Sequence, residues 1–262
     1  MFNAEMMSAW RPLDGHWEMV LPTGWMQGRA VFGGLTAAAC AALGRRVVSV
    51  DRPLRTAGFQ MLRPTVPGSV KGQVEVLREG GHTTFLEVRL QQDSHVTLVA
   101  QLTFMKPRSG DVSVDSRRRW QGPDPEDLED IPDAPGILPE FLQHLSLRWA
   151  EGGIPFSGTE SARIRAYARF KAPSGGVEAV LGLLDAFPCP TLALYTTPTH
   201  ASTVQWTAHL FCAPEELSGW CAFEYETIAA KDGCHAVAGT LHDEQGQLLG
   251  WTEQAVAVFS PR

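Results

Sequence analysis

The residues best suited to chemistry in this 262-residue chain are its five cysteines and eight histidines. No two cysteines form a Cys-x-x-Cys pair, and their odd number argues against a closed disulfide framework, so reduced thiols are expected. Cys40, in an apolar run, and Cys189, between two prolines, are expected in structural roles. The histidines lack the His-x-x-x-His and His-Glu-x-x-His spacings of metal sites. A Gly-x-Ser-x-Gly elbow and a Gly-Lys-Ser/Thr phosphate loop are also missing, so any catalytic side chains are less distinctive ones.

Charge and hydrophobicity exclude several classes of protein. The chain has 22 Lys+Arg against 29 Asp+Glu, a net charge of −7, which is not the electrostatic footprint of a nucleic-acid binder. Its longest apolar stretch, 35–43, is far shorter than the roughly 20 residues that cross a bilayer. The first residues do not have the pattern of a signal peptide. We therefore expect a cytoplasmic protein with no membrane or nucleic-acid partner.

A change in amino-acid composition divides the chain between residues 107 and 139. This stretch contains the basic run Arg117–Arg119, followed by acidic residues interleaved with prolines. Such a composition buries too little apolar area to form a core. The three arginines could bind phosphate, although a solvated surface is the simpler interpretation. We expect an N-terminal unit at 1–106, an exposed linker at 107–139 and a C-terminal unit at 140–262.

The first half is predicted to form one apolar helix followed by strands. Residues 31–43 contain only Gly and Thr besides apolar residues, and a helix that is apolar on every side must be covered on every side. Alternation and turn signals then predict strands at 55–62, 69–78, 83–91 and 95–104.

The second half repeats this order. A strand is expected at 161–170, and Gly175-Gly176 opens a largely apolar helix that runs to about 187. Further strands are expected near 203–211, 219–228, 235–242 and 247–259.

Matched spacings support an internal repeat. His82 and Gln101 are 19 residues apart in the first half, and so are His235 and Gln254 in the second. Both histidines follow turns and are expected to bond to nearby backbone rather than to act as catalysts. One buried helix wrapped by an antiparallel sheet is the hot-dog architecture, so the sequence predicts the α+β class and a double hot-dog. The alternative is a single larger α+β sandwich.

Short motifs in the same order resemble bacterial acyl-CoA thioesterase II and its thioesterase-like relatives, over most of the chain outside the linker. In the first half these motifs are Ala30-Val31-Phe32-Gly33-Gly34, Leu62-Arg63-Pro64 and Leu77-Arg78-Glu79-Gly80. In the second half they are Leu184-Asp185-Ala186, Ser202-Thr203-Val204 and Thr252-Glu253-Gln254. The resemblance implies a double hot-dog enzyme that hydrolyses acyl-CoA without a metal or an organic cofactor.

By this resemblance, the catalytic Asp, Thr and Gln of the family fall on Asp185, Thr203 and Gln254. A carboxylate within an apolar helix can align a water and accept its proton as general base. Thr and Gln can hydrogen-bond that water or polarise the thioester carbonyl. Asp185 would lie near a helix C-terminus, where the helix dipole disfavours negative charge. A carboxylate in such an electrostatically unfavourable position points to function. A solvated or capping role is the alternative.

Gly33 and Gly34 are the expected substrate-binding residues. At the start of a helix their free N–H groups can polarise a carbonyl, or their lack of side chains can serve packing against the sheet. The sequence departs from the family after the threonine, where Gln205-Trp206 replaces a common Asp-His pair.

Three functions remain compatible with the sequence. The first is an acyl-CoA thioesterase, and the second is a non-catalytic acyl-CoA binder. The third is a hydratase or dehydratase of acyl thioesters, which other hot-dog proteins operate with a histidine; neither expected helix contains one. In each case acyl-CoA is the expected partner, and self-association into a homo-oligomer is compatible with the fold.

Overall fold

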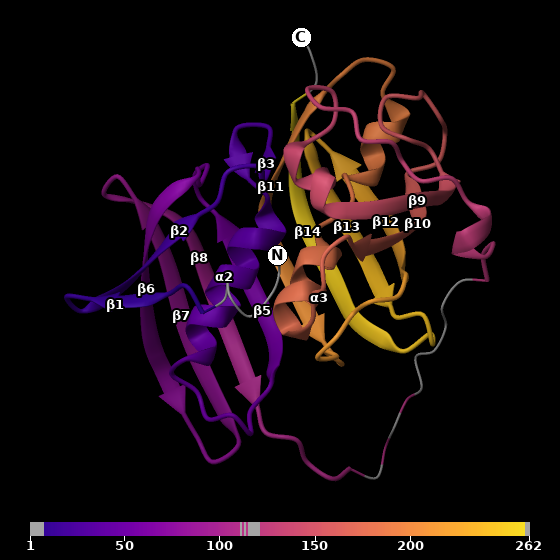
Figure 1. Cartoon of the computed structure of the whole chain (residues 1–262). Helices are drawn as coiled ribbons and strands as arrows, with labels where there is room; N and C mark the ends of the chain where they lie inside the picture. Colours follow the sequence, from indigo (N-terminus) through magenta and orange to yellow (C-terminus); the bar gives the residue numbers. More distant parts are fainter. Residues whose placement is uncertain (1–7, 111, 113, 115–120, 260–262) are drawn as a thin grey trace.

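A computed structural model describes residues 8–110, 112, 114 and 121–259 of the chain. In the described residues, twelve strands form one antiparallel sheet, and β3 and β4 form a separate small hairpin. The helices α2 and α3 lie beside each other on one face of this sheet (Figure 1). The two halves of the chain occupy the two halves of the sheet.

The first half contributes one helix and eight strands. Its elements are β1 (Arg11–Leu13), β2 (His16–Leu21), β3 (Met26–Gln27), β4 (Ala30–Val31), α2 (Gly33–Arg45), β5 (Leu54–Met61), β6 (Gly68–Glu79), β7 (Thr83–Gln92) and β8 (His95–Met105).

The second half begins with two 3₁₀ turns and has a similar order. Its elements are η1 (Pro125–Asp127), η2 (Glu140–His144), β9 (Leu145–Gly152), β10 (Arg163–Phe170), α3 (Gly176–Leu184), η3 (Pro190–Leu194), β11 (His200–Leu210), β12 (Cys221–Lys231), β13 (Cys234–His242) and β14 (Leu248–Phe259).

The strand order shows the internal repeat directly. Across the sheet it is β1-β2-β6-β7-β8-β5-β11-β14-β13-β12-β10-β9. In both halves, the strand after the helix, β5 or β11, lies at the centre of the sheet. The next three strands of the chain run from the outside back toward the centre, so that β8 pairs with β5 and β14 pairs with β11. Each half is therefore one helix wrapped by its own antiparallel sheet, which confirms the predicted double arrangement.

The two halves join through β5 and β11. These strands pair antiparallel, with Phe59 opposite Trp206, and the rings of these two buried residues lie 4.8 Å apart. Pairing satisfies backbone groups that would otherwise form two open sheet edges. The two halves therefore share one continuous sheet.

The two helices run in opposite directions and touch closely. Gly34, in the first turn of α2, lies beside Gly182 near the end of α3, since a Cβ added to Gly34 would be only 3.0 Å from the Gly182 Cα. At the other end, Arg45 in the last turn of α2 attracts Glu178 in the first turn of α3. As expected, nearly all of α2 is buried. No helix in the described ranges is long and apolar enough to span a bilayer.

Element boundaries differ modestly from those expected. The first helix begins at Gly33 rather than residue 31, because Ala30–Val31 pairs with Met26–Gln27 as a hairpin strand and Phe32 takes the N-cap position. The second helix ends at Leu184, since the backbone of Asp185 leaves the helical region. The sequence did not predict β1 to β4 or β9, which are short strands or lie at the outside of the sheet.

Residues 121–130 lie beside β9 of the second half, and residues between 131 and 139 line a cavity that the first half also lines. Arg148 of β9 anchors the former by bonding to Glu126 at 2.9 Å and to Asp130 at 2.7 Å. The Trp220 indole N–H donates to Glu126 at 2.7 Å. Arg117–Arg119 lies outside the described residues. The division into 1–106, 107–139 and 140–262 stays a prediction.

The helix contact predicts that Gly34→Ala destabilises the protein. The new methyl group would lie 2.6 Å from the Phe32 ring and 3.0 Å from the Gly182 backbone. Relief requires the helices to separate, so a loss of about 1–3 kcal/mol in the free energy of unfolding is expected. Denaturant unfolding measures it, with Gly58→Ala as control, because a Cβ at Gly58 meets nothing within 4 Å. Equal stability of the two variants would contradict the proposed contact.

Candidate active site

Asp185 lies where the end of one helix meets the start of the other. It caps the C-terminus of α3 and is half-buried. The N–H of Gly34, in the first turn of α2, donates a hydrogen bond to its carboxylate. Gly33 lies so close that an added Cβ would be 2.6 Å from Oδ2. The positive end of α2 therefore compensates the unfavourable negative end of α3.

The start of α2 is held in place by the second half. Its N-cap residue, Phe32, stacks on Phe141 of η2 with the ring centres 4.0 Å apart. Nearby, Trp25 stacks on His144 at 4.0 Å, and this histidine also bonds to the Gly24 carbonyl at 3.0 Å. The amide that reaches Asp185 thus belongs to the first half but is braced by the second.

The three side chains assigned from the sequence form one hydrogen-bonded chain. The Thr203 hydroxyl donates to Gln254 Oε1 at 2.7 Å. Gln254 Nε2 then donates to Asp185 Oδ1 at 2.9 Å. A helix end, β11 and β14 contribute one residue each, although the residues lie up to 69 positions apart.

A β-bulge allows Thr203 to take part. Its register partner is Val256, whereas Trp206 pairs with Gln254, so one extra residue is inserted between Thr203 and Gln205. Side chains of a regular strand alternate, and Thr203 would then face away from Trp206. The extra residue restores Thr203 to the inner face.

Burial makes the Asp185 carboxyl group a weaker acid than an aspartate in water. Removal of water from around the carboxylate raises its pKa to about 7, against the opposing hydrogen bonds from Gln254 and the Gly34 N–H. A carboxyl group with this pKa exchanges protons near neutral pH, as a general base requires.

Asp185 lines a cavity of about 330 Å³ to which both halves contribute. The first half supplies Gln27, Arg29, Ala30, Val31, Gly33, Thr36, Met61, Leu62, Arg63, Pro64, Thr65 and Thr97. The second half supplies Asp185, Phe187, Pro188, Cys189, Leu192, Ala201, Ser202, Thr203, Gln254 and Val256. All three expected catalytic residues and Gly33 are present, whereas Gly34 does not line the cavity and instead bonds to Asp185 through its backbone.

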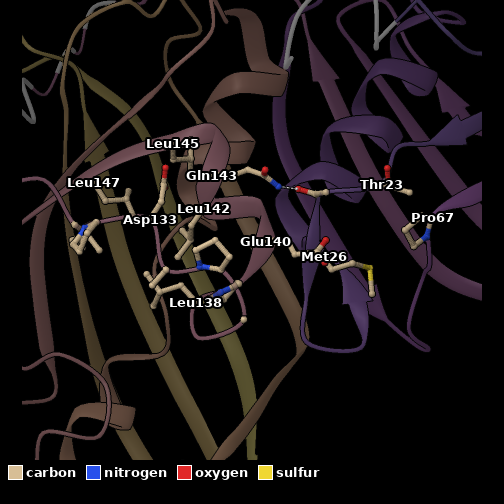
Figure 2. A pocket seen from close by; sticks show the side chains of 17 residues that line it. Thr23, Met26, Pro67, Asp133, Leu138, Glu140, Leu142, Gln143, Leu145 and Leu147 are labelled. Atoms are coloured by element: carbon tan, nitrogen blue, oxygen red, sulfur yellow. Dashed lines mark hydrogen bonds between the residues drawn. The ribbon is translucent and has the colours of Figure 1, made fainter.

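A larger cavity of about 510 Å³ lies elsewhere between the halves (Figure 2). Its walls are mainly apolar side chains such as Met26, Leu138 and Leu142. Gln143 crosses it to donate to the Gly24 carbonyl at 2.8 Å. It holds none of the three residues of the hydrogen-bonded chain of Asp185, Gln254 and Thr203.

The residues matched by the repeat spacing have different surroundings. Gln101 lies exposed opposite Gly58 on β5, whereas Gln254 is buried on the inner face. His82 is exposed in a turn. His235 is buried on β13 but is not among the cavity residues. The matched spacing marked related strands without placing the two glutamines on the same face.

The departure from the family pattern affects the core rather than the cavity. Trp206 is fully buried, packs on Phe59 and donates its indole N–H to Thr252 at 2.6 Å. Gln205 is exposed beside Gln60 of β5. Neither Gln205 nor Trp206 lines the cavity.

Sequence reasoning did not assign Arg29, Thr36 or Arg63 to the site, although all three line it. Arg63 belonged to a motif that supported the resemblance, but nothing in its local sequence indicated that it faces the cavity. That information comes from the packing of distant segments.

Two helices on a sheet joined through β5 and β11, with a shared cavity between them, define a double hot-dog protein. Residues 21–105 match the acyl-CoA thioesterase N-terminal domain, and residues 125–258 match the acyl-CoA thioesterase C-terminal domain. The chain therefore belongs to the acyl-CoA thioesterase II family. No curated protein sequence is significantly similar to it.

Solved structures show the same fold over the whole chain. A conserved protein of unknown function with a hot dog fold from Alicyclobacillus acidocaldarius has a TM-score of 0.87 at 18% identity, covering 98% of each chain. The acyl-CoA thioesterase II TesB2 from Mycobacterium marinum has a TM-score of 0.79 at 16% identity, covering 99% of each chain. The dehydratase domain of PpsC from Mycobacterium tuberculosis, in complex with C12:1-CoA, has a TM-score of 0.57 at 15% identity and covers 93% of each chain. At these identities the likeness concerns the fold.

The raised pKa of Asp185 predicts a pH-dependent cost in stability. A carboxyl group that holds its proton more tightly when folded stabilises the fold at low pH, and this contribution is lost as the pH rises from about 4 to about 7. The free energy of unfolding of the wild type, minus that of Asp185→Asn, should therefore fall across this range and level off above it. Thermal unfolding of both proteins from pH 4 to 8 measures the difference. A difference that does not change with pH would show that Asp185 titrates like an ordinary aspartate.

Proposed function

We propose that this protein hydrolyses an acyl-CoA thioester to the free acid and CoA by direct attack of water, with Asp185 as the general base or water-orienting group. The observation that carries the proposal is a carboxyl group with its pKa raised to about 7, linked to Gln254 and Thr203 in a cavity that both halves enclose. Membership of the acyl-CoA thioesterase II family supports the substrate class.

In the proposed reaction, a water bound by Asp185 attacks the thioester carbonyl. The carboxylate accepts one proton from the water while the new C–O bond forms, and the carbonyl oxygen takes up negative charge. Collapse of this intermediate breaks the C–S bond, and the proton returns from Asp185 to the departing sulfur. No covalent bond to the enzyme is required, because the thiolate is already a good leaving group.

The remaining residues orient and stabilise this reaction in the proposal. Thr203 and Gln254 fix the position of Asp185 and offer hydrogen bonds to water or the carbonyl. Gly33 lines the cavity at the positive end of α2, where developing negative charge is favoured. The Gly34 amide bonds to Asp185 and therefore serves the base rather than the substrate.

Substitution of the three polar residues tests these roles. Asp185→Asn should lower turnover by roughly 10²–10⁴-fold, because the amide cannot accept the proton. Thr203→Ala and Gln254→Ala should cost less, about 1–3 kcal/mol each in activation free energy, since each removes one orienting group. Release of free thiol from acyl-CoA measures turnover.

Asp185→Asn is a suitable probe because the hydrogen-bonded chain can reverse. The Gln254 amide can turn so that its oxygen accepts from the new amide, and the Thr203 hydroxyl can then accept from Gln254. Matched controls are Asp232→Asn, at an exposed turn position with φ of 52°, and Gln101→Ala, on the outer face. Both should retain wild-type turnover. Undiminished activity of Asp185→Asn would refute the mechanism.

The pH dependence of catalysis gives an independent test. If the ionised Asp185 is the base, kcat/KM should rise with pH and level off above an apparent pKa near 7, because burial raises the pKa to about 7. A carboxyl group in water would instead give a rise near pH 4. Steady-state rates measured from pH 4.5 to 8.5 distinguish the two, and a flat profile over this range would contradict the assignment.

The other two functions that the sequence allows correspond to distinct results. Ligand-induced stabilisation by acyl-CoA without thiol release would identify a non-catalytic binder. Hydration or dehydration of an acyl thioester in other hot-dog proteins uses a histidine, and the described residues that line this cavity include none. The thioesterase is therefore the function that the geometry favours.

A further inference from the structure

Two arginines at the catalytic cavity have no role in the reaction described above. Arg29 follows Gly28 in the β3–β4 hairpin, and Arg63 follows the end of β5. Both side chains line the cavity, and both are exposed, so they lie at its opening rather than at its floor. Within the part of the chain that the structure describes, neither guanidinium bonds to a carboxylate or to any other group.

The backbone that carries these arginines is firmly held. The Val31 N–H donates to the Thr65 carbonyl at 2.7 Å, which joins the hairpin to the segment after β5. The N–H groups of Leu62 and Arg63 both donate to the Thr97 carbonyl, at 2.9 and 3.1 Å. The two positive charges therefore project from adjacent segments that are braced against each other.

The charge at this opening contrasts with the rest of the molecule. The chain carries a net charge of −7, and several arginines elsewhere form ion pairs with carboxylates, as where Arg165 contacts both Glu151 and Glu224. Of the residues that line the cavity, Asp185 is the single acidic one, and it lies beyond the two arginines at the α2–α3 contact. An unneutralised cationic pair at the mouth of a cavity attracts anions.

We propose that Arg29 and Arg63 bind the phosphate groups of CoA and thereby make the enzyme select CoA thioesters over thioesters without phosphates. This inference rests on the proposed function. With the thioester carbonyl at Asp185, the pantetheine arm leads out of the cavity, and the strongly hydrated phosphates remain at its opening. Guanidinium groups suit them because they form paired, charge-assisted hydrogen bonds with phosphate oxygens.

The test compares one acyl group on three carriers: CoA, 3′-dephospho-CoA and pantetheine. Arg29→Gln and Arg63→Gln should each raise KM for acyl-CoA by about 10-fold, with kcat changed less than about 2-fold. KM for acyl-pantetheine should stay unchanged, and the dephospho substrate shows which arginine serves the 3′-phosphate. Arg29→Lys and Arg63→Lys should recover part of the loss, because they keep the charge without the paired bonds.

A control separates this local effect from the change in net charge. Arg78→Gln removes one exposed charge on β6, away from the cavity, and should leave KM unchanged for all three substrates. The KM of the wild type for acyl-CoA should also rise with salt, and this dependence should weaken in the two cavity variants.

The outcomes distinguish this inference from the proposed function. Thiol release with equal KM for CoA and pantetheine thioesters, or with KM unaffected by both substitutions, would overturn the arginine assignment and leave the hydrolase intact. An equal loss on acyl-pantetheine would also overturn it, because the arginines would then serve another part of the substrate. If no thioester is hydrolysed, calorimetry with free CoA decides: binding that Arg63→Gln weakens and Asp185→Asn retains would support the arginine site alone.

Discussion

The contact between the start of α2 and the end of α3 is the constraint on which the rest of this structure depends. Two helices can approach this closely only where side chains are absent, and Gly34 beside Gly182 meets that condition. The approach brings the Gly34 N–H within hydrogen-bonding distance of Asp185, a residue of the other repeat. The site therefore exists only when both repeats are folded and docked.

This contact also explains how a carboxylate is tolerated in an unfavourable place. Burial and the C-terminal end of α3 both disfavour its negative charge, and burial is the main reason that its pKa rises to about 7. The opposing N-terminus of α2 and the Gln254 amide partly restore the lost solvation. The result is a group between the two extremes, neither locked in its protonated form nor as acidic as an aspartate in water.

The two repeats have diverged while the sheet that joins them has kept its symmetry. The strands beside the helices follow the same order on both sides of the β5–β11 pair. The hydrogen-bonded side chains of Asp185, Gln254 and Thr203, however, all belong to the second repeat. The first repeat contributes the N-terminus of α2 with Gly33, and also Arg29 and Arg63. The two halves thus share one architecture but contribute different groups to a single cavity.

The sequence by itself determined the two helices, most of the longer strands and the order in which they follow each other. The all-apolar stretch that became α2 could only be a covered helix, and regular alternation marked the main strands, because burial imposes these periods locally. The resemblance of short motifs placed Asp185, Thr203 and Gln254 in one site, and the structure links them in one hydrogen-bonded chain.

Only the tertiary structure decided how these residues face one another. The bulge that turns Thr203 inward changes the direction of a side chain through one extra residue in the pairing, which depends on the partner strand. The exposed position of Gln101, the burial of Trp206 and the place of Arg29 and Arg63 at the cavity follow from contacts between distant segments. The acidity of Asp185 likewise depends on how much water those segments exclude, which no local pattern of residues records.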